Sequence, residues 1–317
     1  MTAESDKFQW AAMLPEQIEE SLKSQSAVRS RPEGDVCVFG VGTSALAGEI
    51  LSDYMDCQSR SQICVVRGAE LPGWVDKNTT AIVVSYSGDT AEALAAYDRL
   101  RARGCVAVCV TSGGELLERG LSNGDCVVRL PQGLVSKDAL GYILGSLAVV
   151  VESMGVCKAA TDLKALIPEL KRYRDSLVCE SRVERMASML VDKIPVIYSI
   201  GSMRSSAVRW RMQIGENTGF PSFCGFLPEF NHNEIVGWTG DSNHGLFVPV
   251  VLYDEGASLW IKNMTCTSMD ILKEKGFEIA TYDANGSGCL EKNVKCIMMG
   301  DLVSARLTHL YVAKASG

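Results

Sequence analysis

One stretch of the chain changes from strand to turn to helix over a short distance, and this constrains the fold most. Residues 81–84 are an apolar run with β-branched side chains, which is typical of a buried strand. The turn Ser85–Thr90 then supplies hydroxyls, a carboxylate and Gly88, which turns the backbone at positive φ without strain. The next residues favour a helix, and Asp89 with Glu92 predicts a capping box at its start. Such units build α/β proteins with parallel sheets.

This turn has the features of an anion-binding site. Free backbone N–H groups and the positive end of the helix dipole converge at a helix start, and the hydroxyls of Ser85, Ser87 and Thr90 add donors. An ordinary capped turn is the alternative, but so many hydroxyls favour a phosphate ligand. The Gly-Lys-Ser/Thr of a nucleotide P-loop is not present in this turn.

A second turn of the same kind follows the strand predicted at 36–39. There Gly42, Thr43 and Ser44 open a helix. Half of a dinucleotide fingerprint is present, but Ala45 stands where its third glycine belongs, so a dinucleotide site is not expected. Because ligands bind at the carboxyl ends of parallel strands, we expect both turns to face one crevice.

The first half of the chain alternates strands and helices, which predicts a parallel sheet covered on both faces. We expect strands at 36–39, 63–66, 81–84, 106–110 and 126–130, and helices at 8–23 (broken near Pro15), 44–55, 90–103, 114–122 and 138–154.

The second half repeats this pattern at low sequence identity. A strand at 195–200 leads into Gly201–Ser206 and a helix from residue 207, after a long helical stretch at 162–192. Later strands are expected at 246–252 and 277–282, and later helices at 257–275 and 300–314. We therefore predict two α/β domains, 1–155 with a leading helix and 156–317.

Composition excludes several classes of protein. The net charge of −7 gives no indication of a nucleic-acid partner, and no apolar run reaches membrane-spanning length. Twelve scattered cysteines without a C-x-x-C pair and the absence of a signal peptide favour a reducing cytoplasm.

A second group of reactive side chains lies around Glu216 and His232. A carboxylate and an imidazole together can open a sugar ring and move a proton between neighbouring carbons. The alternatives are a solvated carboxylate at a helix end for Glu216 and a hydrogen-bonded loop histidine for His232. A metal held by His232 with Glu229 or Glu234 lacks a known ligand spacing, so no metal is expected.

Four segments together resemble the bifunctional phosphoglucose/phosphomannose isomerase family, whose members have two sugar-isomerase (SIS) domains. They are Val38–Glu49, Ser85–Thr90, Gln213–Asn217 and Leu227–Gly237. The resemblance implies two SIS domains, each a five-stranded parallel sheet flanked by helices. It also implies the interconversion of glucose 6-phosphate or mannose 6-phosphate with fructose 6-phosphate, without metal or cofactor.

The resemblance also implies roles for individual residues. Ser44, Ser85, Ser87 and Thr90 match the positions that hold the phosphate, and Gly42 and Thr43 belong to the same pocket. Glu216 matches the base that carries the proton through an enediol. His232 matches the residue that helps open the ring, which the neighbouring subunit of a homodimer supplies.

The chain departs from the family pattern at three places. Lys137 stands where the family has an arginine that stabilises the intermediate, and neighbouring Asp138 is expected to neutralise it in part. Asp89 replaces an asparagine and brings negative charge to the phosphate turn unless it points into its own helix cap. Lys314 is the candidate for the functional lysine that the family has near its end. These departures favour, as an alternative, a non-catalytic sugar-phosphate-binding protein on the same fold.

Overall fold

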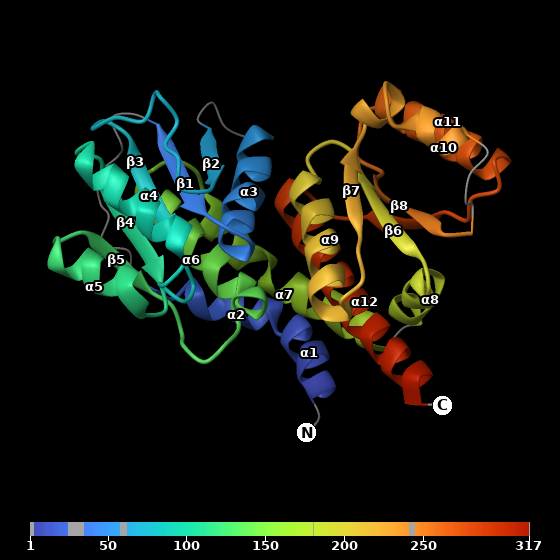
Figure 1. The fold of residues 1–317 in the computed structure, drawn as a ribbon, viewed down its shortest axis with the longest axis horizontal. Coiled ribbons are helices and arrows are strands. Elements are labelled where there is room, and N and C mark those ends of the chain that lie inside the picture. The colour runs from blue at the N-terminus through green and yellow to red at the C-terminus, as the bar shows by residue number, and fades with distance from the viewer. Residues whose placement is uncertain (1–2, 25–34, 58–61, 180, 241–244, 317) are drawn as a thin grey trace. The chain divides into compact units, whose positions relative to one another are not determined.

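The computed structural model describes residues 3–24, 35–57, 62–179, 181–240 and 245–316 of the 317-residue chain (Figure 1). The chain forms two compact units. Met13–Pro168 make up the N-terminal unit, and Met1–Ala12 with Glu169–Gly317 make up the C-terminal unit.

These units differ from the expected domains, 1–155 and 156–317, in two places. The division falls at Pro168, inside one continuous helix. The leading helix joins the C-terminal unit because it packs against the last helix there, and Lys7 Nζ donates to the backbone carbonyl of Asn217 at 2.9 Å. Which ranges fold as domains stays a prediction.

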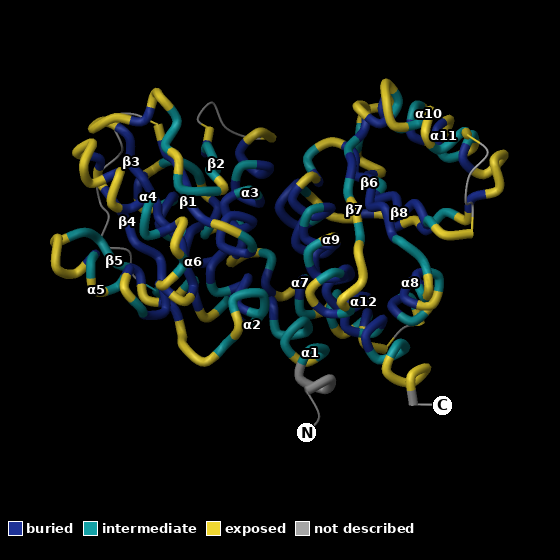
Figure 2. Tube along the Cα trace, viewed as in Figure 1, coloured by how far each residue is buried: buried dark blue, intermediate teal, exposed yellow. Residues whose placement is uncertain are grey.

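The N-terminal unit contains a five-stranded parallel sheet in the order β2-β1-β3-β4-β5. All five expected strands are confirmed within two residues at either end. Their bounds are β1 (Val36–Gly40), β2 (Ile63–Arg67), β3 (Thr80–Val84), β4 (Val106–Thr111) and β5 (Cys126–Arg129). The central strands β1 and β3 are buried along their whole length, as expected of a sheet covered on both faces (Figure 2).

Helices flank this sheet on both sides. Their bounds are α2 (Leu14–Ser21), α3 (Thr43–Asp56), α4 (Ala91–Ala102), α5 (Gly114–Ser122), the 3₁₀ turn η1 (Ser136–Asp138) and α6 (Leu140–Ser153). The helix expected at 8–23 is two helices, α1 (Ala3–Ala12) and α2. The break falls at Met13 because Pro15, which has no N–H to donate, takes up the first turn of α2.

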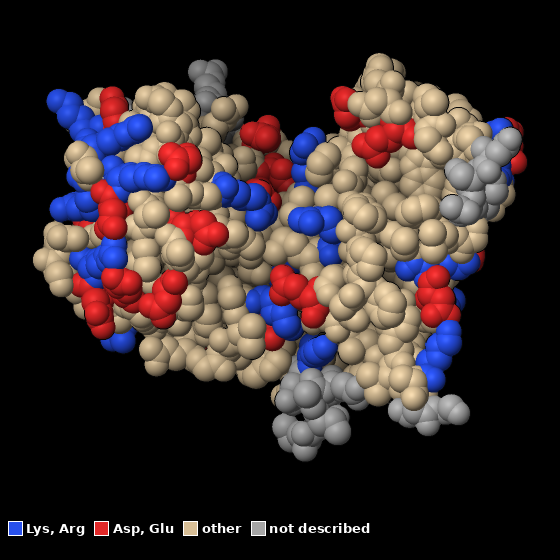
Figure 3. Space-filling view, in the orientation of Figure 1, with Lys and Arg blue, Asp and Glu red and all other residues tan. Residues whose placement is uncertain are grey.

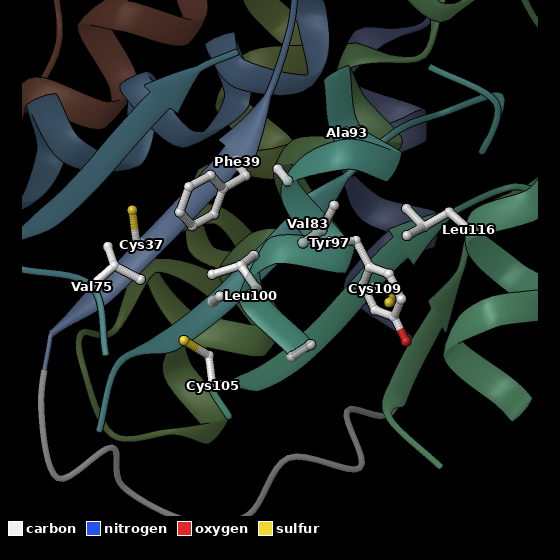
Figure 4. Close-up of a cluster of buried hydrophobic side chains, with 13 residues drawn as sticks. Cys37, Phe39, Val75, Val83, Ala93, Tyr97, Leu100, Cys105, Cys109 and Leu116 are labelled. Atoms are coloured by element: carbon white, nitrogen blue, oxygen red, sulfur yellow. The ribbon is translucent and has the colours of Figure 1, made fainter. Parts of the chain in front are cut away.

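One face of the sheet packs against α4 and α5 through a dense apolar cluster (Figure 4). Phe39 on β1, Val83 on β3, Tyr97 and Leu100 on α4, and Leu116 on α5 belong to it and are at most 1% exposed. Burying each large apolar side chain contributes about 1.5–3 kcal/mol. This packing fixes the strands whose ends carry the two glycine turns.

The C-terminal unit contains four parallel strands among its described residues, in the order β7-β6-β8-β9. They are β6 (Ile194–Ser199), β7 (Phe223–Phe226), β8 (Phe247–Asp254) and β9 (Ala280–Ala284). The order matches β2-β1-β3-β4 strand for strand, which confirms the structural repeat. The expectation of five strands in each sheet is not met here.

Two strand predictions in this unit need correction. β7 was not expected, because it spans only four residues and includes a glycine and the exposed Phe223. β9 begins at Ala280 rather than at 277, because Phe277 and Ile279 pack into a core cluster ahead of the strand instead of pairing with β8.

The helices of this unit also differ in their limits. They are α7 (Ala159–Cys179), which crosses the division, α8 (Arg182–Leu190), α9 (Arg204–Thr218), η2 (Glu229–Asn231), α10 (Ile235–Thr239), α11 (Leu259–Glu274) and α12 (Cys289–Ser316). The stretch expected as one helix at 162–192 is thus α7 and α8. The helix expected at 300–314 begins at Cys289, where Glu291 accepts hydrogen bonds from the backbone N–H and the hydroxyl of Ser287.

We predict that Leu100→Ala lowers the free energy of unfolding by about 2–5 kcal/mol, because it opens a cavity under α4. Urea unfolding followed by circular dichroism measures this. Leu121→Ala is the matched control: that side chain is 63% exposed, so a change below about 0.5 kcal/mol is expected. Equal losses in both variants would contradict the packing described here.

Candidate functional site

The first glycine turn joins β1 to α3. Gly42 is the residue before the helix and has φ of 61°, which a glycine adopts without strain. Thr43 and Ser44 form the first turn of α3 and are buried. The turn is also close to β3, because a Cβ on Gly40 would lie 3.1 Å from the carbonyl oxygen of Val84. This proximity favours glycine at position 40, because a side chain there would push the neighbouring backbone apart.

The second turn joins β3 to α4 and is held by its own hydroxyls. Ser85 Oγ lies 2.9 Å from Thr90 Oγ1 and accepts from the backbone N–H of Gly88 at 3.1 Å. Ser87 Oγ accepts from the N–H of Asp89 at 3.2 Å and is exposed. Since β1 and β3 are adjacent parallel strands, both turns lie at the same edge of the sheet, and the crevice that they are expected to face stays a prediction.

Asp89 does not cap its own helix, so the predicted capping box is wrong. Thr90 is the N-cap of α4, and no side chain there makes a capping bond. Asp89 Oδ1 instead accepts from the backbone N–H of Glu115 at 2.9 Å, in the first turn of α5. Its negative charge is therefore directed at the positive end of the α5 dipole. Because Asp89 does not point into its own helix cap, its effect on a phosphate in this turn stays a prediction.

Lys137 lies in η1, in the same unit as the two turns. Its Nζ pairs with Asp138 Oδ1 at 2.8 Å, and both side chains are 15% exposed. The expectation that Asp138 neutralises this lysine in part is confirmed. The charge that remains is held in a partly buried position, where electrostatic interactions are stronger than in water.

Glu216 lies in the last turn of α9 and is exposed. The helix that carries it is fixed to α12 by buried polar groups. The Arg209 guanidinium pairs with the Asp301 carboxylate through two bonds of 2.8 Å, and Trp210 Nε1 donates to the carbonyl of Cys296 at 2.9 Å. The end of α9 is fixed as well, because both Lys7 Nζ and Thr308 Oγ1 donate to the carbonyl of Asn217.

Sequence reasoning missed this polar seam between α9 and α12. The signal that could have revealed it is the spacing of Arg209, Gln213 and Asn217 at every fourth residue, which places them on one helix face. Asn217 Nδ2 donates to Ser304 Oγ at 2.9 Å and thereby continues the seam toward the end of α9.

His232 follows η2 and is exposed. Its backbone N–H donates to the carbonyl of Glu229, and Tyr198 Oη donates to Glu234 Oε2 at 2.9 Å close by. Burial and that hydrogen bond raise the pKa of Tyr198 well above its usual range, so its hydroxyl stays protonated. These hydrogen bonds hold the turn that carries His232, and the histidine itself is exposed to solvent.

Lys314 lies near the end of α12, where it is exposed and paired with Asp192. The roles expected for Lys314, Glu216 and His232 stay predictions. Among the residues that the structure describes, no group of three or more His, Cys, Asp or Glu side chains could hold a metal ion.

The described parts of the chain show how charge is distributed on one face and whether any helix could span a membrane. On the face drawn in Figure 3, Lys and Arg side chains are interspersed with Asp and Glu over the N-terminal unit, at the left. No helix in the described ranges is long and apolar enough to span a membrane.

Comparison with solved structures defines the class of fold. A protein from Clostridium difficile that is named as a phosphosugar isomerase superposes with a TM-score of 0.75 at 13% identity, covering 98% of this chain and 94% of that one. The C-terminal domain of glucosamine-fructose-6-phosphate aminotransferase from Francisella tularensis gives 0.70 at 12% identity, covering 96% and 95%. At these identities the likeness shows the fold alone.

Sequence comparison defines the family. Residues 180–314 match the family described as the bacterial phospho-glucose isomerase C-terminal SIS domain. A bifunctional phosphoglucose/phosphomannose isomerase from Caldicellulosiruptor bescii is 33% identical over 321 residues, which cover 96% of this chain and 93% of that protein. The chain belongs to the bifunctional phosphoglucose/phosphomannose isomerase family, as the four motifs indicated.

Another relative has a different name. The D-glucosamine-6-phosphate 4-epimerase from Sulfolobus acidocaldarius is 32% identical over 220 residues, which cover 68% of each chain.

We predict that Asp89→Ala destabilises the protein by about 1 kcal/mol, because α5 loses the acceptor at its first turn, and that Asp89→Asn costs less. Thermal and urea unfolding measure both variants. Asp98→Ala, which removes an exposed partner of Arg119, is the control and should change stability by about 0.5 kcal/mol or less. Unchanged stability in Asp89→Ala would show that the cap contributes nothing.

Proposed function

We propose that this protein is an aldose–ketose isomerase that interconverts glucose 6-phosphate or mannose 6-phosphate, or both, with fructose 6-phosphate through an enediol. The observation that carries the proposal is the 33% identity over 96% of the chain to a relative named for these isomerisations. The two turns and the two candidate proton-transfer residues of that reaction are all present in the chain.

Substrate phosphate is anchored in this proposal by Ser44, Ser85, Ser87 and Thr90, with Gly42 and Thr43 shaping the pocket. The support is geometric: both turns follow adjacent strands and open helices, so their backbone N–H groups and hydroxyls lie at one edge of the sheet. Binding energy from the phosphate then positions the sugar for the chemical step.

Glu216 is the base in this proposal. It takes a proton from C1 or C2 of the open-chain sugar and returns it to the other of these two carbons. His232 helps open the ring, and Lys137 supplies positive charge to the enediolate. The pairing of Lys137 with Asp138 weakens that charge, and lysine lacks the planar fork of arginine. We therefore expect a functional but modest stabilisation of the intermediate. Lys314 is proposed as a further pocket residue.

The active unit in this proposal is a homodimer of chains with two SIS domains, 1–155 and 156–317, working in the cytoplasm without metal or cofactor. Both Glu216 and His232 are exposed in the single chain. A second copy that supplies His232 to the site of its partner would exclude water from both side chains, which strengthens their electrostatic interactions with the substrate.

We predict that purified protein converts fructose 6-phosphate to glucose 6-phosphate, mannose 6-phosphate or both, and that Glu216→Gln lowers kcat by about 100-fold to 10,000-fold because the base is lost. A coupled assay of each product measures this. Glu118→Gln, at an exposed position on α5, is the matched control and should retain full turnover.

Other outcomes of this assay separate the alternatives. Thermal stabilisation by fructose 6-phosphate without turnover would identify a sugar-phosphate-binding protein instead of an enzyme. If the assay is repeated with glucosamine 6-phosphate and only that compound is converted, the activity would resemble the one for which the Sulfolobus acidocaldarius relative is named. Full turnover in Glu216→Gln would exclude Glu216 as the base.

We predict that mixing Glu216→Gln chains with His232→Ala chains restores about a quarter of wild-type activity after exchange of subunits. If the site is shared, half of the dimers are mixed, and each mixed dimer has one intact site of two. Activity of the mixture relative to each variant alone measures this. No recovery, with mixed dimers detected by native mass spectrometry, would show that each site lies within one chain.

A further inference from the structure

The segment 131–138, between β5 and α6, carries Lys137. Its first residues, Pro131, Gln132 and Gly133, are exposed, and Gly133 has φ of 96°. An exposed segment with such a glycine has many conformations open to it, so side-chain contacts must fix where its lysine lies.

Tyr86 supplies such contacts at the start of the segment. Its hydroxyl donates to the carbonyl of Pro131 at 2.7 Å and accepts from the backbone N–H of Leu134 at 3.1 Å. The tyrosine is only 5% exposed, so these bonds are shielded from water. Tyr86 stands between Ser85 and Ser87, in the middle of the proposed phosphate turn.

The backbone around Tyr86 is fixed from β4. Both the N–H and the Oγ of Ser112 donate to the carbonyl of Tyr86, at 2.9 and 2.6 Å. Gln132 Nε2 donates to the carbonyl of Ser112 at 2.8 Å, which joins the segment to the same point. The turn, the end of β4 and the segment thus form one hydrogen-bonded group.

Gln17 fixes the other end of the segment. Its Nε2 donates to the carbonyl of Asp138 at 2.8 Å, and its Oε1 accepts from the N–H of Gly141 at 3.1 Å. Gln17 is 1% exposed, and a Cβ on Gly141 would lie 2.6 Å from Gln17 Cβ, so only glycine permits this approach. Lys137 is therefore held between two clamps, Tyr86 before it and Gln17 after it.

We propose that Tyr86 is a positioning residue that sets the place of Lys137 relative to the phosphate turn. This rests on the proposed function, in which the turn holds the phosphate and Lys137 faces the enediolate. Because one side chain joins the two, the phosphate anchor and the charge that stabilises the intermediate keep a fixed separation. A small misplacement of a positioned group has a large effect on rate.

Tyr86→Phe tests this, because it removes only the hydroxyl. We expect kcat for fructose 6-phosphate to fall about tenfold while KM changes less than about twofold, since phosphate binding is retained and positioning of Lys137 is lost. Tyr97→Phe is the matched control. Tyr97 is equally buried in the same unit, and its hydroxyl donates to Asp125 Oδ2 at 2.5 Å and accepts from Asn123 Nδ2 at 2.8 Å. This variant should leave kcat unchanged.

A double-mutant cycle separates positioning from general weakening of the fold. If Tyr86 acts through Lys137, Tyr86→Phe should have no further effect on kcat in a Lys137→Met background. A tenfold fall in kcat on adding Tyr86→Phe to the Lys137→Met background would overturn the proposal. A rise in KM without a fall in kcat in the Tyr86→Phe single variant would also overturn it. So would an unchanged kcat in Tyr86→Phe.

Hydrogen exchange provides a readout that does not need turnover. Amide exchange of peptides covering 131–138 should quicken in Tyr86→Phe and stay unchanged in Tyr97→Phe, because Leu134 loses its acceptor only in the first. Faster exchange in Tyr86→Phe, together with a wild-type protein that shows no turnover, would overturn the proposed function but not the clamp. Unchanged exchange would overturn the clamp whatever the activity.

Discussion

The parallel pairing of β1 with β3 is the constraint on which the candidate phosphate site depends. The register joins Val36 to Thr80 and Phe39 to Val83, so the two strands end together. Two turns that are far apart in the sequence therefore open side by side, and Gly40 allows them to approach closely. The apolar cluster under α4 and α5 stabilises this register, because a shift by one residue would turn the strand side chains of the cluster to the opposite face and leave its helix side chains without packing partners.

The two candidate proton-transfer residues, Glu216 and His232, are held in place by different kinds of interaction. Glu216 depends on the packing of α9 against α12, where a buried Arg209–Asp301 pair lies between the helices. Such a pair contributes little net stability, because desolvation of both charges offsets their attraction. The pair nevertheless favours the observed arrangement of the two helices, since an arrangement that separated Arg209 from Asp301 would lose two hydrogen bonds between buried charges. The exposed His232 depends on a short braced turn instead.

Much of the fold could be predicted from the sequence. All five strands of the N-terminal unit followed from apolar runs that alternate with helical stretches, and so did the recurrence of strand, glycine turn and helix in the second half. The strands that were missed or misplaced are β7 and β9. In β7 the apolar signal is short, and before β9 the apolar residues Phe277 and Ile279 serve core packing rather than the strand ladder. The limits of α7, α8 and α12 were misplaced, because helix ends depend on contacts that local propensity does not contain.

The sequence by itself determined the two hydroxyl turns, their position after strands, and the family, because these depend on local patterns and motifs. Only the tertiary structure decided where Asp89 directs its charge, which residue Tyr86 holds, and how Gln17 reaches Asp138. The partners in these contacts are 26, 45 and 121 residues apart along the chain. A hydroxyl or carboxylate can bond to any donor or acceptor within reach, and which group comes within reach is set by the packing of the sheet and its helices.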